Sequence, residues 1–201
     1  MKAYIFPGQG AQFPGMGKDL FDSSEIARNM FHRANEILGF DISKIMFEGS
    51  EEDLRQTKVT QPAVFIHSVV LATLLGDQFQ PNMVAGHSLG EYSALTAAGA
   101  FDIATAAKLL RLRGEAMQKA TPPGTGAMAA LLGAEIELAQ EICAAAATNP
   151  ETGKKEVVEA ANDNGGGQVV ISGTLDALAR AGEIAKSKGI KRALALPVSA
   201  P

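Results

Sequence analysis

Apolar residues in the first part of the chain form two short runs that predict β-strands. Ala3 to Phe6 is a continuous apolar run stopped by Pro7-Gly8, which predicts a buried strand followed by a tight loop. Met83 to Ala85 predicts a second short strand that leads into another glycine-containing turn. Two strands do not make a stable parallel sheet, so this part of the fold is expected to be incomplete.

Longer stretches around these strands predict helices. Ser23 or Ser24 can cap the first helix, and Gly39 is its predicted stop. The second begins near a Gln-Pro pair and continues through a long apolar segment, the third is rich in alanine, and Asp102 is expected to cap the fourth. The predicted spans are residues 24–38, about 61 to 75, 91–99 and 102–120.

The composition changes at TPPGTG, residues 121–126, a Pro/Gly-rich linker that marks a subdomain boundary. Beyond it the pattern reads strand, helix, strand, strand, helix, strand. The predicted spans are residues 127–132, 135–147, 157–161, 168–172, 175–188 and 191–196. This βαββαβ order is the ferredoxin-like arrangement.

Composition narrows the class of protein. With 46% hydrophobic and 20% charged residues, the chain resembles a soluble globular enzyme, and its net charge of -4 gives no general attraction to nucleic acid or anionic membranes. One cysteine, Cys143, cannot form an intramolecular disulfide, which fits a reducing, cytoplasmic compartment. The N-terminal apolar run is too short for a signal peptide, and no run approaches the roughly 20 residues of a membrane span.

The strongest chemical signal is Gly86-His87-Ser88-Leu89-Gly90, between a predicted strand and a predicted helix. This is the nucleophile-elbow pattern, in which the glycines allow a sharp turn and the serine hydroxyl is exposed. A helix N-terminus beside Ser88 would favour a nearby oxyanion. The alternative is an ordinary turn in which Ser88 only caps the helix.

A nucleophilic serine needs a base, and none of the three histidines is convincing. His87 adjoins Ser88, so its side chain points in another direction and is a better supporting residue than a base. His32 lies on a predicted helix and is expected to be partly exposed. His67 lies within an apolar helix, as a core histidine would.

Pro7-Gly8-Gln9-Gly10 follows the first strand, where its backbone could offer an N–H to an oxyanion, although the same residues could form a plain loop. The segment is not a dinucleotide-binding fingerprint, because Phe13 stands where the third glycine would be. The sequence has no Walker A motif and no Cys/His cluster with metal-ligand spacing. We therefore expect no cofactor and no metal.

Arg111 and Arg113 lie two positions apart on a predicted helix and must face different ways. If one of them turns inward it needs an anion, and a substrate carboxylate would be a suitable bidentate partner. A solvated surface arginine is the alternative.

Together these segments resemble the malonyl-CoA:acyl-carrier-protein transacylases of fatty-acid synthesis and the related acyltransferase domains of polyketide synthases. The resemblance covers the whole chain. Its motifs are FPGQGAQFPGMG (6–17), TQPAVF (60–65), GHSLGEYSAL (86–95), RLRGEAMQ (111–118), GTGAMAALLG (124–133), GGQVVISG (166–173) and ALPVSAP (195–201).

The resemblance implies roles for individual residues. Ser88 would be the acylated nucleophile, and the N–H groups of Gln9 and Leu89 would form the oxyanion hole. Arg113 would bind the malonyl carboxylate. Asn162 falls near an active-site asparagine, although Asp163 stands where the family usually has an aromatic residue.

The implied fold is α/β, with an α/β-hydrolase-like large subdomain, incomplete here, and a ferredoxin-like βαββαβ small subdomain. Residues 1–123 would belong to the large subdomain and 124–196 to the small one, with 197–201 as a truncated return segment. In the family, the catalytic histidine follows a stretch like PVSAP, whereas this sequence ends at Pro201. The resemblance therefore predicts that the base is missing and that this chain alone is nearly inactive.

The implied reaction is transfer of a malonyl group from malonyl-CoA to the phosphopantetheine thiol of acyl carrier protein. These two partners, a cytoplasmic location and a monomer are expected, without nucleic acid or membrane. A serine esterase or thioesterase remains an alternative, since it shares the elbow. A non-catalytic module that docks acyl carrier protein is another, with a basic patch at residues 186, 188, 191 and 192.

Overall fold

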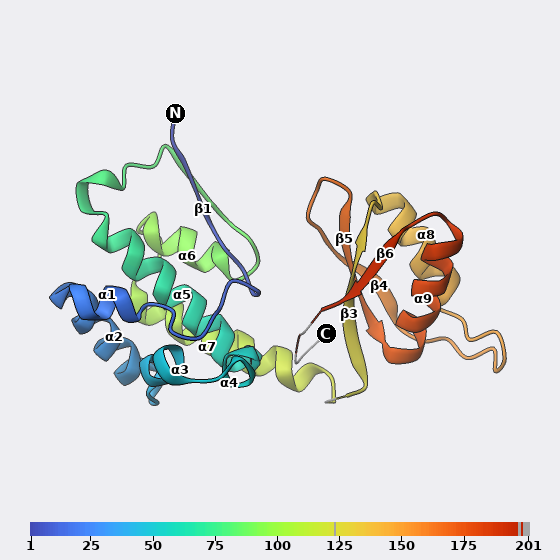
Figure 1. Cartoon of the computed structure of the whole chain (residues 1–201), viewed down its shortest axis with the longest axis horizontal. Coiled ribbons are helices and arrows are strands. Elements are labelled where there is room, and N and C mark those ends of the chain that lie inside the picture. The colour runs from blue at the N-terminus through green and yellow to red at the C-terminus, as the bar shows by residue number, and fades with distance from the viewer. Residues whose placement is uncertain (123, 197, 199–201) are drawn as a thin grey trace. The chain divides into compact units, whose positions relative to one another are not determined.

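A computed structural model describes residues 1–122, 124–196 and 198 (Figure 1). The chain forms two compact units, Met1–Ala116 and Met117–Pro201. The division falls within a helix and not in the TPPGTG segment, whose Pro123 is outside the described residues. The predicted return segment, 197–201, also lies outside them except for Val198.

The first unit contains the two predicted strands, β1 (Ala3–Phe6) and β2 (Met83–Gly86). They pair in parallel, with Ala3 opposite Met83 and Phe6 opposite Gly86. Because the strands run the same way, the loop after β1 and the turn after β2 begin at the same edge of the sheet. That edge carries the candidate site.

Helices make up most of this unit. They are α1 (Lys18–Ser23), α2 (Glu25–Leu38), α3 (Ile42–Glu48), α4 (Glu51–Arg55), α5 (Thr57–Leu74), α6 (Gly90–Ala97) and α7 (Ile103–Ala120), with a 3₁₀ turn at Gly76–Gln78. The helices predicted around α2, α5, α6 and α7 are confirmed. Three short helices, α1, α3 and α4, were not predicted. A capping box between Ser50 and Asp53 begins α4, and it was visible in the sequence.

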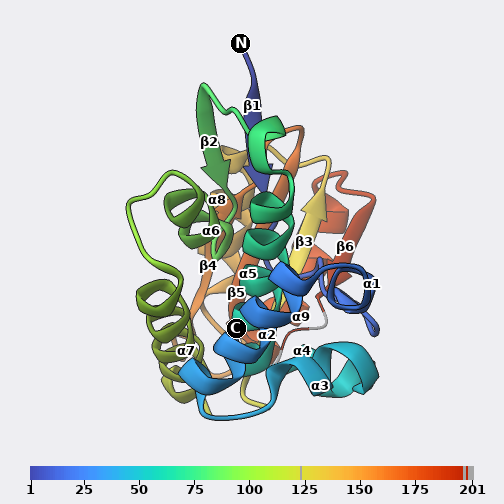
Figure 2. The ribbon, with the colours of Figure 1, turned by 90° about the vertical axis from the view of Figure 1, so that its left-hand side faces the viewer.

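The predicted start of the long apolar helix was wrong. α5 begins at Thr57, and Pro62 lies inside it. Proline removes the bond to the carbonyl one turn earlier. Burial outweighs this loss, because nearly every side chain from Thr57 to Val70 is buried. α5 packs against α2, α3, α4 and α6 and is the centre of this unit's core (Figure 2).

The second unit has the predicted βαββαβ order. Its elements are β3 (Gly126–Leu132), α8 (Ile136–Ala146), β4 (Val158–Asp163), β5 (Gln168–Thr174), α9 (Leu175–Ser187) and β6 (Arg192–Ala195). The strands form an antiparallel sheet in the order β4-β5-β3-β6. α8 and α9 pack against each other and the sheet, and enclose a second core. The α/β class is confirmed.

Among the helices of the described residues, none has the length and apolar character needed to cross a membrane.

Candidate active site

Ser88 lies in the turn between β2 and α6, with its side chain exposed. Its φ is 53°, and it is the one non-glycine residue with positive φ in the described part of the chain. That conformation is strained for an L-residue. The strained serine at a strand-to-helix turn is the geometry expected of a nucleophile elbow.

The two flanking glycines allow β2, α6 and β1 to approach closely. A Cβ at Gly86 would lie 1.9 Å from the carbonyl carbon of Gly90, and one at Gly90 would lie 2.4 Å from the carbonyl oxygen of Phe6. No side chain fits at such distances. The glycines are therefore required by backbone packing, as the elbow interpretation predicts.

Two backbone N–H groups lie at the sheet edge that carries Ser88. Gln9 follows β1 and Leu89 precedes α6, so both lie at the edge where the parallel strands end. In the described part of the chain, neither N–H group has a hydrogen-bond partner. The Leu89 side chain is fully buried, which fixes this peptide at the start of α6. Free N–H groups at a helix N-terminus can stabilise an oxyanion.

His87 lies against the loop that carries Gln9. Its backbone N–H donates to the Phe6 carbonyl at 3.1 Å. Its ring lies over Gly8, where a Cβ would be 2.6 Å from His87 Nδ1. This contact places the imidazole against the loop after β1, and a supporting role for His87 stays a prediction.

Arg113 contacts the candidate nucleophile directly. Its Nη2 donates a hydrogen bond to Ser88 Oγ at 3.0 Å. The side chain is half-buried, and its Nη1 is buried without a hydrogen-bond partner. Arg111 faces the other way, with Nε donating to Glu115 at 3.0 Å and Nη1 donating to the Leu38 carbonyl. The structure thus decides which of the two arginines turns inward.

A buried, unpartnered guanidinium nitrogen has a free-energy cost that an anion would remove. A carboxylate suits it best, since it can accept two parallel N–H bonds. The position beside Ser88 means that such a carboxylate would lie close to the attacking oxygen. A direct bond between Arg113 and Ser88 was not predicted from the sequence.

Sequence reasoning missed Gly114, which fixes the helix that carries Arg113. A Cβ there would lie 3.0 Å from Lys58 Cα and 3.1 Å from the Thr57 carbonyl oxygen. The absence of a side chain lets α7 approach the start of α5. A glycine inside a helix normally weakens it, so a helical glycine in the RLRGEAMQ segment was an available signal of close packing.

The other histidines contact apolar rings. His32 is exposed on α2, and its ring forms a T-shaped contact with the ring of Phe21. His67 is half-buried on α5 and contacts the ring of Phe13. Burial lowers the pKa of His67, and the nearby Asp19 carboxylate partly opposes this. Within the described residues, the bond from Arg113 is the one interaction of the Ser88 hydroxyl, so neither histidine acts on it.

Asn162 lies on β4 in the second unit. A β-bulge at Ala161 shifts the register, so that Asn162 pairs with Val170. Residues directly opposite each other in an antiparallel pair share a face. Val170 is buried but does not belong to the core that α8 and α9 enclose. Asn162 therefore lies on the sheet face that points away from these helices. Its role beside Ser88 stays a prediction.

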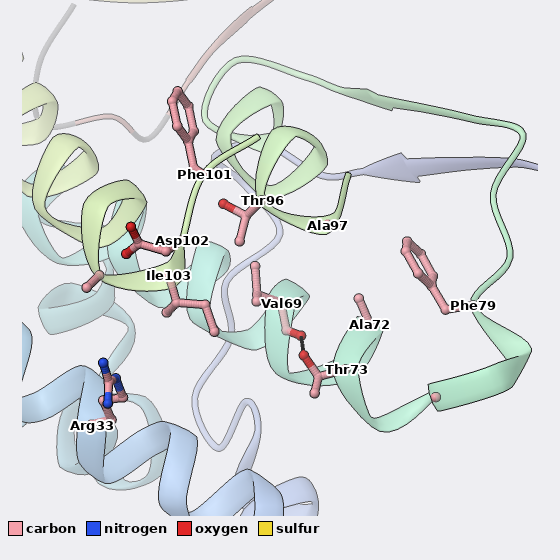
Figure 3. A pocket seen from close by; sticks show the side chains of 12 residues that line it. Arg33, Val69, Ala72, Thr73, Phe79, Thr96, Ala97, Phe101, Asp102 and Ile103 are labelled. Atoms are coloured by element: carbon pink, nitrogen blue, oxygen red, sulfur yellow. Dashed lines mark hydrogen bonds between the residues drawn. The ribbon is translucent and has the colours of Figure 1, made fainter. Parts of the chain in front are cut away.

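A cavity of about 570 Å³ lies elsewhere in the first unit (Figure 3). Its lining includes Thr96 and Ala97 at the end of α6, Phe101 before α7, and Arg33 from α2. Ser88 precedes α6, at the other end of that helix. The cavity is therefore separate from the elbow. Among the described residues there is no group of three or more His, Cys, Asp or Glu side chains that could hold a metal ion.

Comparison with known proteins gives one consistent family. The acyl transferase domain family matches residues 3–197. Malonyl CoA-acyl carrier protein transacylases from Bacillus subtilis and Escherichia coli are 44% and 45% identical over 99% of this chain. The chain spans 62% and 63% of the lengths of these two relatives.

Solved structures agree in fold. An acyl carrier protein S-malonyltransferase from Vibrio cholerae has a TM-score of 0.88 and 47% identity, covering 99% of this chain and 64% of its own. A malonyl-transacylase in complex with a type II PKS acyl-carrier protein has a TM-score of 0.90 and 42% identity, covering 99% and 63%. With its strained serine, close-packed glycines and matching sequence, the chain belongs to the acyl transferase domain family.

Proposed function

We propose that this chain carries the nucleophile and substrate-binding residues of a malonyl-CoA:acyl-carrier-protein transacylase. The observation that carries the proposal is the position of Arg113, which bonds Ser88 Oγ and has a buried Nη1 without a partner. A nucleophile beside an unsatisfied cation suits an acyl group that bears its own carboxylate. The names of the relatives support the same reaction.

In the proposed reaction, Ser88 Oγ attacks the thioester carbonyl of malonyl-CoA and coenzyme A leaves as the thiol. The N–H groups of Gln9 and Leu89 stabilise the oxyanion, each contributing about 10²- to 10³-fold in rate. The phosphopantetheine thiol of acyl carrier protein then attacks the malonyl-Ser88 ester, which frees the serine. Asn162 contributes to substrate binding, and His87 supports the loop of Gln9.

The proposed architecture places these residues in an α/β-hydrolase-like subdomain, with the second unit as a ferredoxin-like subdomain. The βαββαβ order and the strand order β4-β5-β3-β6 support the latter. Residues 1–123, 124–196 and 197–201 remain our proposed divisions. A monomer in the cytoplasm is expected.

The alternative functions have less support. A serine esterase or thioesterase has no use for a guanidinium beside its nucleophile. A basic docking patch is weakened by ion pairs, because Lys186 pairs with Glu183 and Lys188 pairs with Glu141. Malonyl transfer accounts for both Ser88 and Arg113.

Intact-mass analysis with peptide mapping tests the proposal. Two proteins are mixed with malonyl-CoA. One is the 201-residue chain, and the other is a chimera in which this chain is followed by the remaining C-terminal part of the Bacillus subtilis relative. We expect one malonyl group on Ser88 in the chimera and none in Ser88→Ala. The 201-residue chain should react about 10⁴-fold more slowly than the chimera, because none of its histidines contacts the Ser88 hydroxyl within the described residues.

A second arm separates the transferase from an esterase. Arg113→Met in the chimera should lose acylation by malonyl-CoA while it still reacts with a neutral nitrophenyl ester. Acylation at another residue, or equal loss with both reagents, would contradict the proposal. Rapid turnover by the 201-residue chain would show that no further base is required.

A further inference from the structure

The Arg113–Ser88 hydrogen bond has a second consequence, which rests on the proposed function. The bond from Nη2 engages one of the two lone pairs of Ser88 Oγ and draws electron density from the oxygen that must attack a carbonyl carbon. A hydrogen bond to a charged donor is stronger than a neutral one. In the unliganded protein, the Arg113 guanidinium therefore restrains Ser88 Oγ and makes it less nucleophilic.

The second terminal nitrogen of the guanidinium, Nη1, can accept a new partner. Nη1 is buried without a partner, so an incoming carboxylate gains a bond there that nothing else in the described residues supplies. A carboxylate on the guanidinium compensates its charge and draws it away from the weaker acceptor, a neutral hydroxyl. The bond to Ser88 Oγ is weakened as the carboxylate binds.

We propose that Arg113 restrains Ser88 in the free protein and that the carboxylate of the substrate releases it. An acyl group with a carboxylate thereby frees its own nucleophile, whereas a neutral acyl group meets a serine still bonded to Arg113. After acylation, the ester oxygen of Ser88 is a poor acceptor, and the malonyl carboxylate keeps the guanidinium. Arg113 then favours a carboxylate-bearing substrate in two ways. It binds the carboxylate, and it releases Ser88 for attack only when the carboxylate is bound.

The helix surroundings support a fixed position for the guanidinium. Gly114 holds α7 against the start of α5, with its backbone in close contact with Lys58. Ser88 is fixed by its positive φ and by the two glycines of the elbow. With both backbones fixed, only the two side chains can break the bond.

The test measures how fast Ser88 reacts with phenylmethylsulfonyl fluoride, a neutral reagent. Ser88 Oγ displaces fluoride from sulfur, and the hydroxyl proton goes to the buffer. Intact mass and peptide mapping follow labelling in the wild-type chain, Arg113→Met, Arg113→Gln and the matched control Arg111→Met, with Ser88→Ala as the blank. Circular dichroism checks that each variant is folded.

We expect both Arg113 variants to react about 10-fold faster than wild type, since a charge-assisted hydrogen bond is lost. Arg111→Met should react like wild type, because Arg111 faces Glu115 on the same helix. Formate, a carboxylate too small to block the site, should accelerate wild-type labelling compared with chloride at equal ionic strength. Formate should have no effect on the Arg113 variants.

Three results would overturn the restraint. Slower or unchanged labelling in folded Arg113 variants would show that the cation activates Ser88 or does not affect it. A failure of formate to accelerate wild-type labelling would contradict release. If malonyl-CoA still acylates Ser88 in the chimera, these results leave the proposed transferase intact, whereas a chimera whose Ser88 reacts with neither reagent would contradict both proposals.

Discussion

Ser88 adopts a backbone conformation that costs about 1–3 kcal/mol for a non-glycine residue. The cost is accepted because neighbouring contacts hold the turn: Gly86 and Gly90 bring β2 and α6 together, and Leu89 is buried behind them. The same turn exposes the Ser88 hydroxyl to Arg113. At the level of single residues, the site depends on glycines, which leave room for close backbone contacts, as much as on the side chains of Ser88 and Arg113.

Replacement of a glycine in the elbow should therefore be severe. Gly90→Ala places a Cβ 2.4 Å from the Phe6 carbonyl oxygen, and we expect a loss of about 2 kcal/mol or more in the free energy of unfolding. Gly182→Ala is the matched control, since Gly182 lies in α9 with open space around it. That change should stabilise the protein by about 0.5–1 kcal/mol. Urea unfolding measures both, and equal effects would contradict the packing argument.

His67 should make the protein sensitive to acid. Burial lowers its pKa in the folded state below the ordinary value of 6.5, so the unfolded state binds the proton more tightly. The free energy of unfolding should fall as the pH drops below about 6.5 and level off below the folded pKa. His67→Gln should remove this part of the pH dependence. Thermal unfolding from pH 5 to 8 measures it, and an identical slope in both proteins would contradict the assignment.

At the scale of elements, helix ends follow side-chain capping. Ser24 caps α2 by accepting a hydrogen bond from the Ala27 N–H, and Gly39 ends the helix with φ at 72°. Asp102 accepts a bond from the Thr105 N–H at the start of α7, and this bond lowers its pKa. These caps set where α2 and α7 begin.

The choice between Ser23 and Ser24 as the cap can be tested directly. Ser24→Ala should lower the free energy of unfolding by about 1 kcal/mol, because the Ala27 N–H loses its partner. Ser23→Ala should have a smaller effect, since the Ser23 hydroxyl donates to the Asp19 and Leu20 carbonyls within α1 and caps no free N–H group. Denaturant midpoints of the two variants decide the matter, and a larger effect at Ser23 would mean that the assigned cap is wrong.

At the scale of the whole molecule, the chain has two cores. One surrounds α5 in the first unit, and the other lies between the sheet of the second unit and α8 and α9. Cys143 is buried in the second core, where burial and the nearby Glu159 carboxylate raise the pKa of its thiol to about 11. Its reactivity is therefore a measure of how often that core opens.

Alkylation of Cys143 should be slow in the native protein. With its pKa near 11 instead of 9, the thiol has about a hundredfold less thiolate at pH 8, and burial blocks access further. We expect iodoacetamide to react at least about 100-fold more slowly in buffer than in denaturant, as measured by intact mass. Comparable rates would contradict the burial of Cys143.

Features that depend on neighbours along the chain were predictable from the amino-acid sequence. Both strands of the first unit, the βαββαβ order of the second and the elbow around Ser88 were all predictable, because hydrophobic period, caps and glycine pairs act over a few residues. The motifs also identified the family, since their order along the chain is specific.

Features that join distant residues depend on the packing of the folded chain. α5 continues through Pro62 because its burial outweighs one lost hydrogen bond. Arg113, and not Arg111, reaches Ser88 because the packing of α7 at Gly114 sets the rotation of that helix. Local pattern limits which faces a helix can bury, but the packing of the whole unit selects one of them. Contacts between side chains far apart in sequence are therefore fixed by the fold as a whole.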